Sequence, residues 1–197
     1  MLHLLPTIFS VYFQFVAKVF IIMPQQLVVT AIGADRTGIV SKIARLVTDC
    51  QCNIIDSRMA IFGAEFTFIL LISGETSGIN RVEHLLPNLG LELELTTMTK
   101  RTSAHQNKAV AAYYILDYSG PNKVGTLGAI TGFLASREVY IGSLQSSVRV
   151  DNDSAIEKTH TIMTLELPTT EPAENIITDL ITLLEQMGLI GTVQAQT

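Results

Sequence analysis

The sequence has few of the residues that build metal centres and disulfide frameworks. Among its 197 residues there are two cysteines and no tryptophan, and only 16% are charged. Cys50 and Cys52 are one residue apart, which is too close for an unstrained disulfide within a regular element. No nearby histidine or second cysteine pair completes a zinc set. We therefore expect two reduced thiols, a cytoplasmic protein and no metal site.

A clustered block of basic residues is also missing. The 13 lysine and arginine residues are scattered and are outnumbered by 18 aspartate and glutamate residues, so the formal net charge is -5. A protein that grips nucleic acid directly needs a clustered basic face, because its contacts have to neutralise phosphates. We therefore expect no direct nucleic-acid binding. The hydrophobic content of 48% excludes an intrinsically disordered chain.

The first part of the chain is a long apolar run without the marks of a signal peptide. Its start carries no lysine or arginine, no Ala-x-Ala cleavage pattern follows, and Pro6, Gln14 and Lys18 interrupt it. The clean stretches are shorter than the ~20 residues that span a bilayer. We interpret residues 1–24 as an apolar extension from a start placed too far upstream, with Met23 as the true beginning, and expect no membrane partner. A membrane-surface segment and a true signal or span are the alternatives.

The chain contains an internal repeat. Three pairs of like residues are each separated by 87 positions: Gly38 and Gly125, Ile43 and Ile130, and Ile54 and Ile141. Because one register fits all three pairs, the sequence divides into two related halves.

The first half shows strand and helix patterns in turn. β-Branched and alternating apolar runs predict strands, and apolar residues at three- and four-residue spacing predict helices. The order is βαββαβ: strand 26–32, a turn at 33–38, a helix from Ile39, strands 53–61 and 65–72, a helix from Ser77 that Pro87 and Gly90 end, and strand 91–95.

The second half repeats this order. The predicted elements are strand 111–118, loop 119–123, helix 124–137, strands 141–150 and 159–167, helix 173–187 and strand 189–194. The segment between the halves is polar and has no apolar period, which is typical of a linker. We therefore expect domains at 25–99 and 110–197, joined by a linker at 100–109.

A βαββαβ unit is the ferredoxin-like arrangement, in which four antiparallel strands form a sheet with both helices on one face. The sequence thus predicts an α+β fold of two tandem ferredoxin-like domains. The other sheet face and the sheet edges have to be covered. We expect the two halves to cover each other or a second chain, and we expect a homodimer.

Residues for catalysis are not grouped in the sequence. The four histidines are dispersed, and none has an acidic residue or cysteine at the spacing of metal ligands. Gly33 and Gly38 resemble a phosphate loop only superficially, because no Lys-Ser or Lys-Thr pair follows them. Without a positioned nucleophile, acid–base pair or cofactor loop, we expect a protein that is not an enzyme and that uses no cofactor.

The most informative segment is the turn from Gly33 to Gly38. It combines a carboxylate at Asp35, a guanidinium at Arg36 and the backbone N–H groups of a helix N-terminus, and such a loop can hold a ligand carboxylate. Asp35 then accepts from an α-amino group. In the alternative, purely structural interpretation, Asp35 caps the helix and Gly38 lets the helix approach the sheet.

The segments 33–40, 52–58 and 62–68 resemble the first half of an ACT domain. From about residue 25 to residue 193 the chain is similar to a family of small bacterial transcriptional repressors built from two tandem ACT domains. ACT domains are regulatory modules that bind amino acids between paired domains, using the first strand-to-helix loop and the start of the second strand. The resemblance therefore implies a ligand site formed by Asp35, Arg36, Thr37 and Gly38 of the loop, with Asn53 and Asp56 of the strand.

The second half departs from this pattern. Residues 120–125 read Gly-Pro-Asn-Lys-Val-Gly where the family has an Asp-Arg pair, which argues against ligand binding there and favours a role in pairing. The resemblance implies a co-repressor that binds the LysR-type activator of the glycine-cleavage operon, with glycine as the effector that relieves repression. An ACT-type amino-acid sensor that regulates a metabolic enzyme in trans is the alternative.

Overall fold

The computed structural model describes residues 24–103, 110–150 and 157–196. The chain divides into two compact units after residue 105, called unit 1 (residues 24–103) and unit 2 (residues 110–196) below. Residues 1–23 of the expected apolar extension and residues 104–109 of the expected linker lie outside the described residues. Within the three described ranges, no helix is long and apolar enough to cross a membrane.

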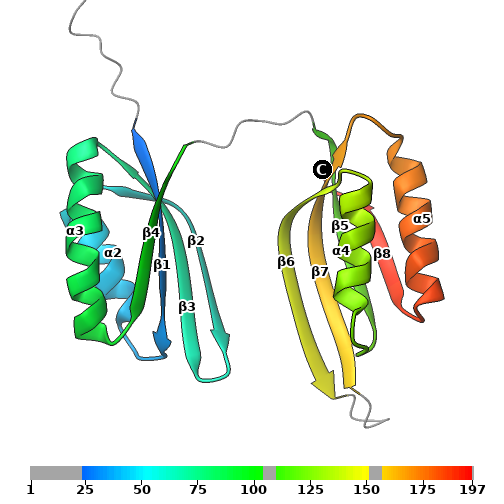
Figure 1. Ribbon diagram of the computed structural model, residues 1–197, viewed down its shortest axis with the longest axis horizontal. Helices are drawn as coiled ribbons and strands as arrows, with labels where there is room; N and C mark the ends of the chain where they lie inside the picture. The colour runs from blue at the N-terminus through cyan, green and yellow to red at the C-terminus, as the bar shows by residue number, and fades with distance from the viewer. Residues whose placement is uncertain (1–23, 104–109, 151–156, 197) are drawn as a thin grey trace, which may run out of the picture. The chain divides into compact units, whose positions relative to one another are not determined.

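Unit 1 is a four-stranded antiparallel sheet with two helices on one face (Figure 1). The strand order across the sheet is β2-β3-β1-β4. The elements are β1 (Gln25–Ala34), α2 (Ile39–Asp49), β2 (Asn53–Phe62), β3 (Glu65–Gly74), α3 (Thr76–Leu93) and β4 (Thr96–Thr102).

Unit 2 repeats this arrangement with the strand order β6-β7-β5-β8. The elements are β5 (Val110–Pro121), α4 (Thr126–Ser136), β6 (Tyr140–Val150), β7 (Glu157–Pro168), α5 (Ala173–Gln186) and β8 (Ile190–Ala195). The prediction of two tandem ferredoxin-like α+β domains is confirmed.

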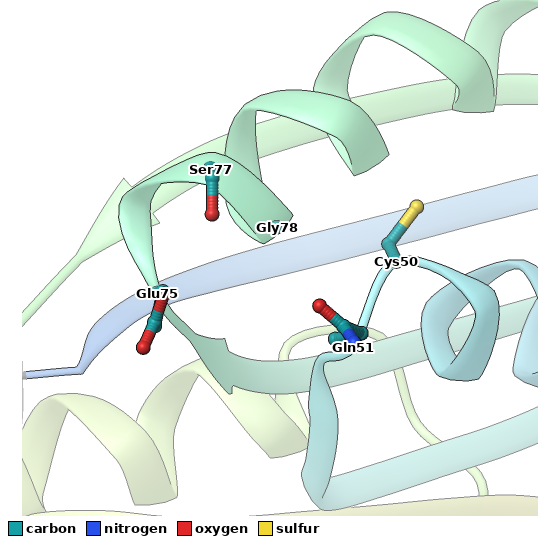
Figure 2. Close-up of a pocket in the computed structure, with 5 residues that line it drawn as sticks. All are labelled: Cys50, Gln51, Glu75, Ser77 and Gly78. Carbon is teal, nitrogen blue, oxygen red and sulfur yellow. The ribbon is translucent and has the colours of Figure 1, made fainter.

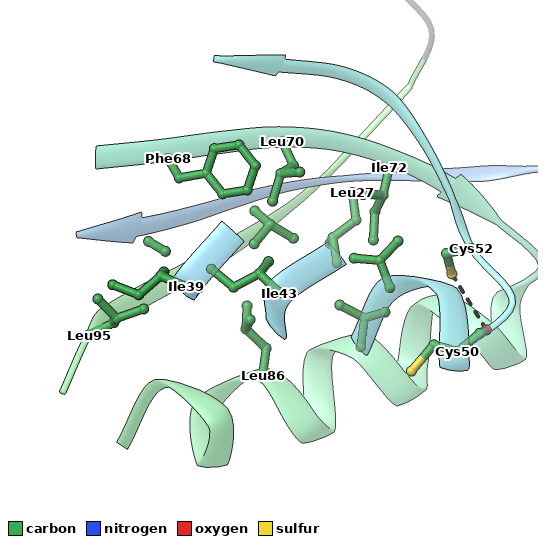
Figure 3. Close-up of a cluster of buried hydrophobic side chains, with 14 of the residues drawn as sticks. Leu27, Ile39, Ile43, Cys50, Cys52, Phe68, Leu70, Ile72, Leu86 and Leu95 are labelled. Carbon is green, nitrogen blue, oxygen red and sulfur yellow. Dashed lines mark hydrogen bonds between the residues drawn. The ribbon is translucent and has the colours of Figure 1, made fainter. Parts of the chain in front are cut away.

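The core of unit 1 lies between the sheet and its helices (Figure 3). The alternation of side chains along β1 turns Leu27, Val29 and Ala31 toward the helices, and all three are fully buried. Helix α2 contributes Ile39 and Ile43 from one stripe, and both are buried. Because Ala31 and Ile39 flank the β1–α2 loop, the core anchors the chain on both sides of that loop.

The 87-residue repeat is visible in the backbone. Gly38 and Gly125 each precede the first helix of their unit, with φ of 93° and 88°. A β-bulge follows Ile54 in β2 and Ile141 in β6. The register inferred from the sequence therefore matches equivalent positions in the two units.

Helix α3 is longer than predicted, and the strand predicted at 91–95 is wrong. The helix continues through Pro87 and Gly90 to Leu93 before β4 begins. Leu86, Gly90 and Leu93 are buried, and their spacing of four and three residues is helical. Packing of this stripe on the sheet outweighs the local alternation of leucine and glutamate.

Strand β4 contains Lys100, Arg101 and Thr102, which the polar sequence pattern places in the linker. Arg101 ties this strand to α3, because its guanidinium donates to Glu83 at 2.6 and 3.0 Å and to Asn80 at 2.5 Å. As the last strand of the sheet, β4 has one free edge, and an edge strand tolerates charged side chains. The polar residues at 100–102 are therefore explained by the position of β4 at the edge of the sheet, and not by a linker.

The Arg101–Glu83 pair makes the stability of unit 1 sensitive to acid. The hydrogen bond from Arg101 lowers the pKa of Glu83 below its ordinary value of 4.5. The ionised carboxylate therefore stabilises the fold above its ordinary pKa, and this contribution is lost as the pH falls through the lowered pKa. We expect Glu83→Gln to be less stable than the parent at neutral pH, with a gap that closes in acid. Urea unfolding across this pH range measures the gap, and a gap independent of pH contradicts the prediction.

Candidate functional site

The β1–α2 loop, residues 35–38, is organised by the backbone of Gly38. This glycine is the N-cap of α2 with φ 93°, and its carbonyl accepts a hydrogen bond from the N–H of Lys42 at 3.0 Å. No described side chain caps α2, so the alternative in which Asp35 caps it is wrong. A Cβ at Gly38 would meet nothing within 4 Å. A glycine is therefore favoured here because the backbone is left-handed, and not because the helix lies too close to the sheet for a side chain.

The side chains of Asp35, Arg36 and Thr37 are exposed on this loop. Arg36 donates to the Oε2 atom of Glu94, the C-cap residue directly after α3, at 2.5 Å. The side chains of Arg36 and Glu94 are 45% and 75% exposed, so solvent screens this ion pair and each group can exchange partners. The loop thus presents a guanidinium, a carboxylate and a helix N-terminus, groups that complement a zwitterion.

Asn53 and Asp56 lie at the opposite end of the same sheet. Asn53 pairs with Ser73 in β3, and Ser73 pairs with Gln26 near the start of β1. The loop follows Ala34, eight positions beyond Gln26 in the same strand, and at ~3.3 Å per residue this separation is about 26 Å. One unit therefore does not bring Asn53 and the loop together.

The predicted ligand residues of β2 differ in their surroundings. The carboxylate of Asp56 accepts from the backbone N–H of Ser57 at 2.7 Å and from the guanidinium of Arg58 at 3.1 Å. Asn53 is exposed at the start of the strand. A ligand group that used Asp56 would have to share that carboxylate with Arg58.

The equivalent loop of unit 2 keeps the left-handed glycine but not the charged pair. Asn122 and Lys123 stand where unit 1 has Asp35 and Arg36. The ammonium group of Lys123 donates to the carbonyl of Met187, at the end of α5, over 3.5 Å. The basic side chain of both loops thus reaches the end of the second helix, but only in unit 1 does it pair with a carboxylate.

The structure also contains a hollow that the sequence did not indicate (Figure 2). It has a volume of about 190 Å³ and lies where α2 ends and α3 begins, lined by Cys50, Gln51, Glu75, Ser77 and Gly78. None of the predicted ligand residues lines it. The carboxylate of Glu75 makes it a poor match for an anionic group.

The two cysteines are free and buried. The thiol of Cys52 donates to the carbonyl of Cys50 at 3.7 Å. Burial raises the pKa of both thiols, although Arg81 opposes the shift, so neither is a ready nucleophile. In the described parts of the chain, no group of three or more histidine, cysteine, aspartate and glutamate side chains is placed to hold a metal ion.

Comparison with known proteins agrees with this architecture. Residues 25–100 match the family described as the ACT domain. The chain is 36% identical over 150 residues to the glycine cleavage system transcriptional repressors of Escherichia coli K12 and Shigella flexneri, with 76% of this chain and 79% of each relative covered. A crystal structure of a protein assigned as a glycine cleavage system transcriptional repressor is also 36% identical, with a TM-score of 0.67 over 88% of this chain and 98% of that chain. An unknown protein from Galdieria sulphuraria shares the fold at 23% identity, with a TM-score of 0.71 over 88% of this chain and 99% of that chain.

Two βαββαβ units, each with a left-handed glycine before its first helix, define a tandem ACT-domain protein. The similarity to the curated repressors covers most of the chain and exceeds a third in identity. The chain belongs to the family of the glycine cleavage system transcriptional repressor. Both of these curated relatives are named as transcriptional repressors.

Proposed function

We propose that this protein is a co-repressor of the glycine-cleavage operon that binds a LysR-type activator, and that glycine relieves the repression. The observation that carries the proposal is the 36% identity to curated glycine cleavage system transcriptional repressors over 76% of the chain. Similarity of this extent, through both ACT units, supports a shared regulatory role.

The charge distribution supports binding to a protein in preference to DNA. The net charge is -5, and several arginines are already paired with acidic side chains inside their own unit. Arg36 holds Glu94, Arg101 holds Glu83, and Arg137 holds Glu171 and Asp179. Phosphate binding would have to compete with these pairs, whereas a co-repressor that contacts an activator needs no basic face.

The edge strands β2 and β6 supply surfaces for contact with another protein. Both strands carry large apolar side chains that are exposed in their own unit: Ile55, Met59, Ile61 and Phe62 in β2, and Tyr140, Ile141, Leu144, Val148 and Val150 in β6. Apolar edge strands pair readily with other chains unless they are covered. This feature supports an interaction role for the protein.

Glycine suits the charge and size of the β1–α2 loop. The guanidinium of Arg36 and the N–H groups at the start of α2 complement a carboxylate, and Asp35 complements an ammonium group. Glycine has few non-hydrogen atoms, so a ceiling of about -1.5 kcal/mol per atom limits its affinity to the micromolar range or weaker. Relief of repression further requires glycine to bind the free protein more tightly than the activator complex, because equal affinity shifts nothing.

A pull-down of the purified LysR-type activator tests the proposal. The chain is immobilised and the activator is applied without amino acid or with millimolar glycine, alanine or serine. We expect capture that glycine alone reverses. Capture that no amino acid alters would remove glycine as the effector, and no capture under any condition would remove the co-repressor role.

A further inference from the structure

Glu94 has a backbone conformation that is unusual for its residue type. It is the C-cap of α3 with φ of 56°, in the left-handed region that glycine adopts freely and other residues adopt at a cost. Its carboxylate accepts the hydrogen bond from Arg36, so the strained residue contacts the loop proposed as the effector site.

Unit 2 shows that the turn itself does not require glutamate. A Cβ at Gly33 would face the carbonyl of Glu94, and a Cβ at Gly120, 87 positions later, would face the carbonyl of Gly188. Gly188 therefore occupies in unit 2 the place of Glu94 in unit 1, and its φ is 72°. The fold accepts glycine here without strain, so the turn alone does not explain the glutamate.

The group that accepts the hydrogen bond from the basic loop residue, Arg36 or Lys123, also differs between the two units. In unit 2, Lys123 reaches a neutral acceptor, the carbonyl of Met187, which directly precedes Gly188. In unit 1, Arg36 faces the charged carboxylate of Glu94. The glutamate thus neutralises a cation in the unit whose loop carries the Asp-Arg pair.

We propose that Glu94 is an internal counter-ion that occupies Arg36 in the effector-free protein and that an effector carboxylate displaces it. This rests on the proposed function, because that function assigns Arg36 to the effector. The carboxylates of Glu94 and of the effector compete for one guanidinium. The observed affinity for the effector is therefore the intrinsic affinity multiplied by the fraction of Arg36 that is not paired with Glu94. Both side chains are exposed to solvent, so the competition is modest and weakens as salt is added. Glu94 thereby raises the effector concentration at which the site fills.

Glycine titration of the full chain by calorimetry tests this, with the parent compared to Glu94→Gly and Glu94→Gln. The first variant keeps the left-handed turn, and the second keeps the side-chain shape without the charge. Both are expected to bind glycine about two- to fivefold more tightly at low salt, the range set by the strength of exposed ion pairs. The matched control is Glu92→Gln, which removes a neighbouring carboxylate that holds Lys42 at 2.8 Å. Its glycine affinity is expected to equal that of the parent.

A second titration distinguishes the failure of this proposal from the failure of the proposed function. Acetate supplies a carboxylate without an amino group, and the side-chain NMR signal of Arg36 reports its partner. A stronger acetate response in Glu94→Gly than in the parent supports the counter-ion, even where glycine does not bind and the effector assignment fails. Glycine and acetate responses in both Glu94 variants that equal or fall below those of the parent overturn it.

Discussion

An Arg36→Ala variant is expected to bind glycine about 10- to 150-fold more weakly than the parent while keeping its fold. Hydrogen bonds to charged groups contribute about 1.5–3 kcal/mol, which corresponds to that range. The fold loses only the exposed ion pair with Glu94, and such pairs contribute at most about 1 kcal/mol. Calorimetry measures the affinity, and far-ultraviolet circular dichroism checks the fold. Because the variant binds the effector more weakly, release of its activator in the pull-down should need a correspondingly higher glycine concentration than in the parent.

The matched control for Arg36→Ala is Lys123→Ala. Lys123 occupies the equivalent position in unit 2, where it contacts a main-chain carbonyl and the loop lacks the Asp-Arg pair. Its removal is expected to leave glycine binding unchanged. If both variants lost affinity equally, the effector would use the loops of both units; an unchanged affinity in Arg36→Ala would remove this arginine from the site.

The order of the elements could be predicted because it depends on short-range periodicity. The alternation of Leu27, Val29 and Ala31 and the helical spacing of Ile39 and Ile43 are local patterns, and the structure buries these residues as the patterns indicate. The second helix of unit 1 was harder to bound, because leucines at 91, 93 and 95 fit both a strand and the end of a helix. Only the packing of the helix stripe against the sheet decides between them.

The candidate site was less accessible to sequence reasoning because it depends on long-range geometry. Asn53 and the β1–α2 loop are close in the chain, yet the sheet register places them at opposite ends of unit 1. Arg36 and Glu94 are 58 positions apart and meet because α3 ends beside the loop. No local pattern encodes either relation. The two units together distinguish these contributions. The turn after the second helix requires only a left-handed residue, which is Gly188 in unit 2, whereas unit 1 adds the carboxylate of Glu94.

A Gly78→Ala variant is expected to destabilise unit 1 by a net amount of about 2 kcal/mol, although alanine is the better helix former. A Cβ at Gly78 would lie 2.5 Å from the carbonyl oxygen of Cys50 and 3.0 Å from the Sγ of Cys52. Forcing a methyl group against backbone costs about 1–3 kcal/mol and occasionally more, and at 2.5 Å the cost lies at the upper end. The gain in helix propensity, up to about 1 kcal/mol, does not offset this cost.

Gly132→Ala is the matched control, because a Cβ on this exposed residue of α4 would meet nothing within 4 Å. The same substitution there is expected to stabilise unit 2 by about 0.5–1 kcal/mol through propensity alone. Urea unfolding followed by amide NMR signals from each unit measures both changes separately, which matters because the two units need not unfold together. If Gly78→Ala lowers and Gly132→Ala raises the free energy of unfolding, the backbone at the end of α2 packs directly against Gly78 and leaves no room for a methyl group. Stabilisation by both alanines would mean that the helices can separate there at little cost, and that the end of α2 is not fixed against α3.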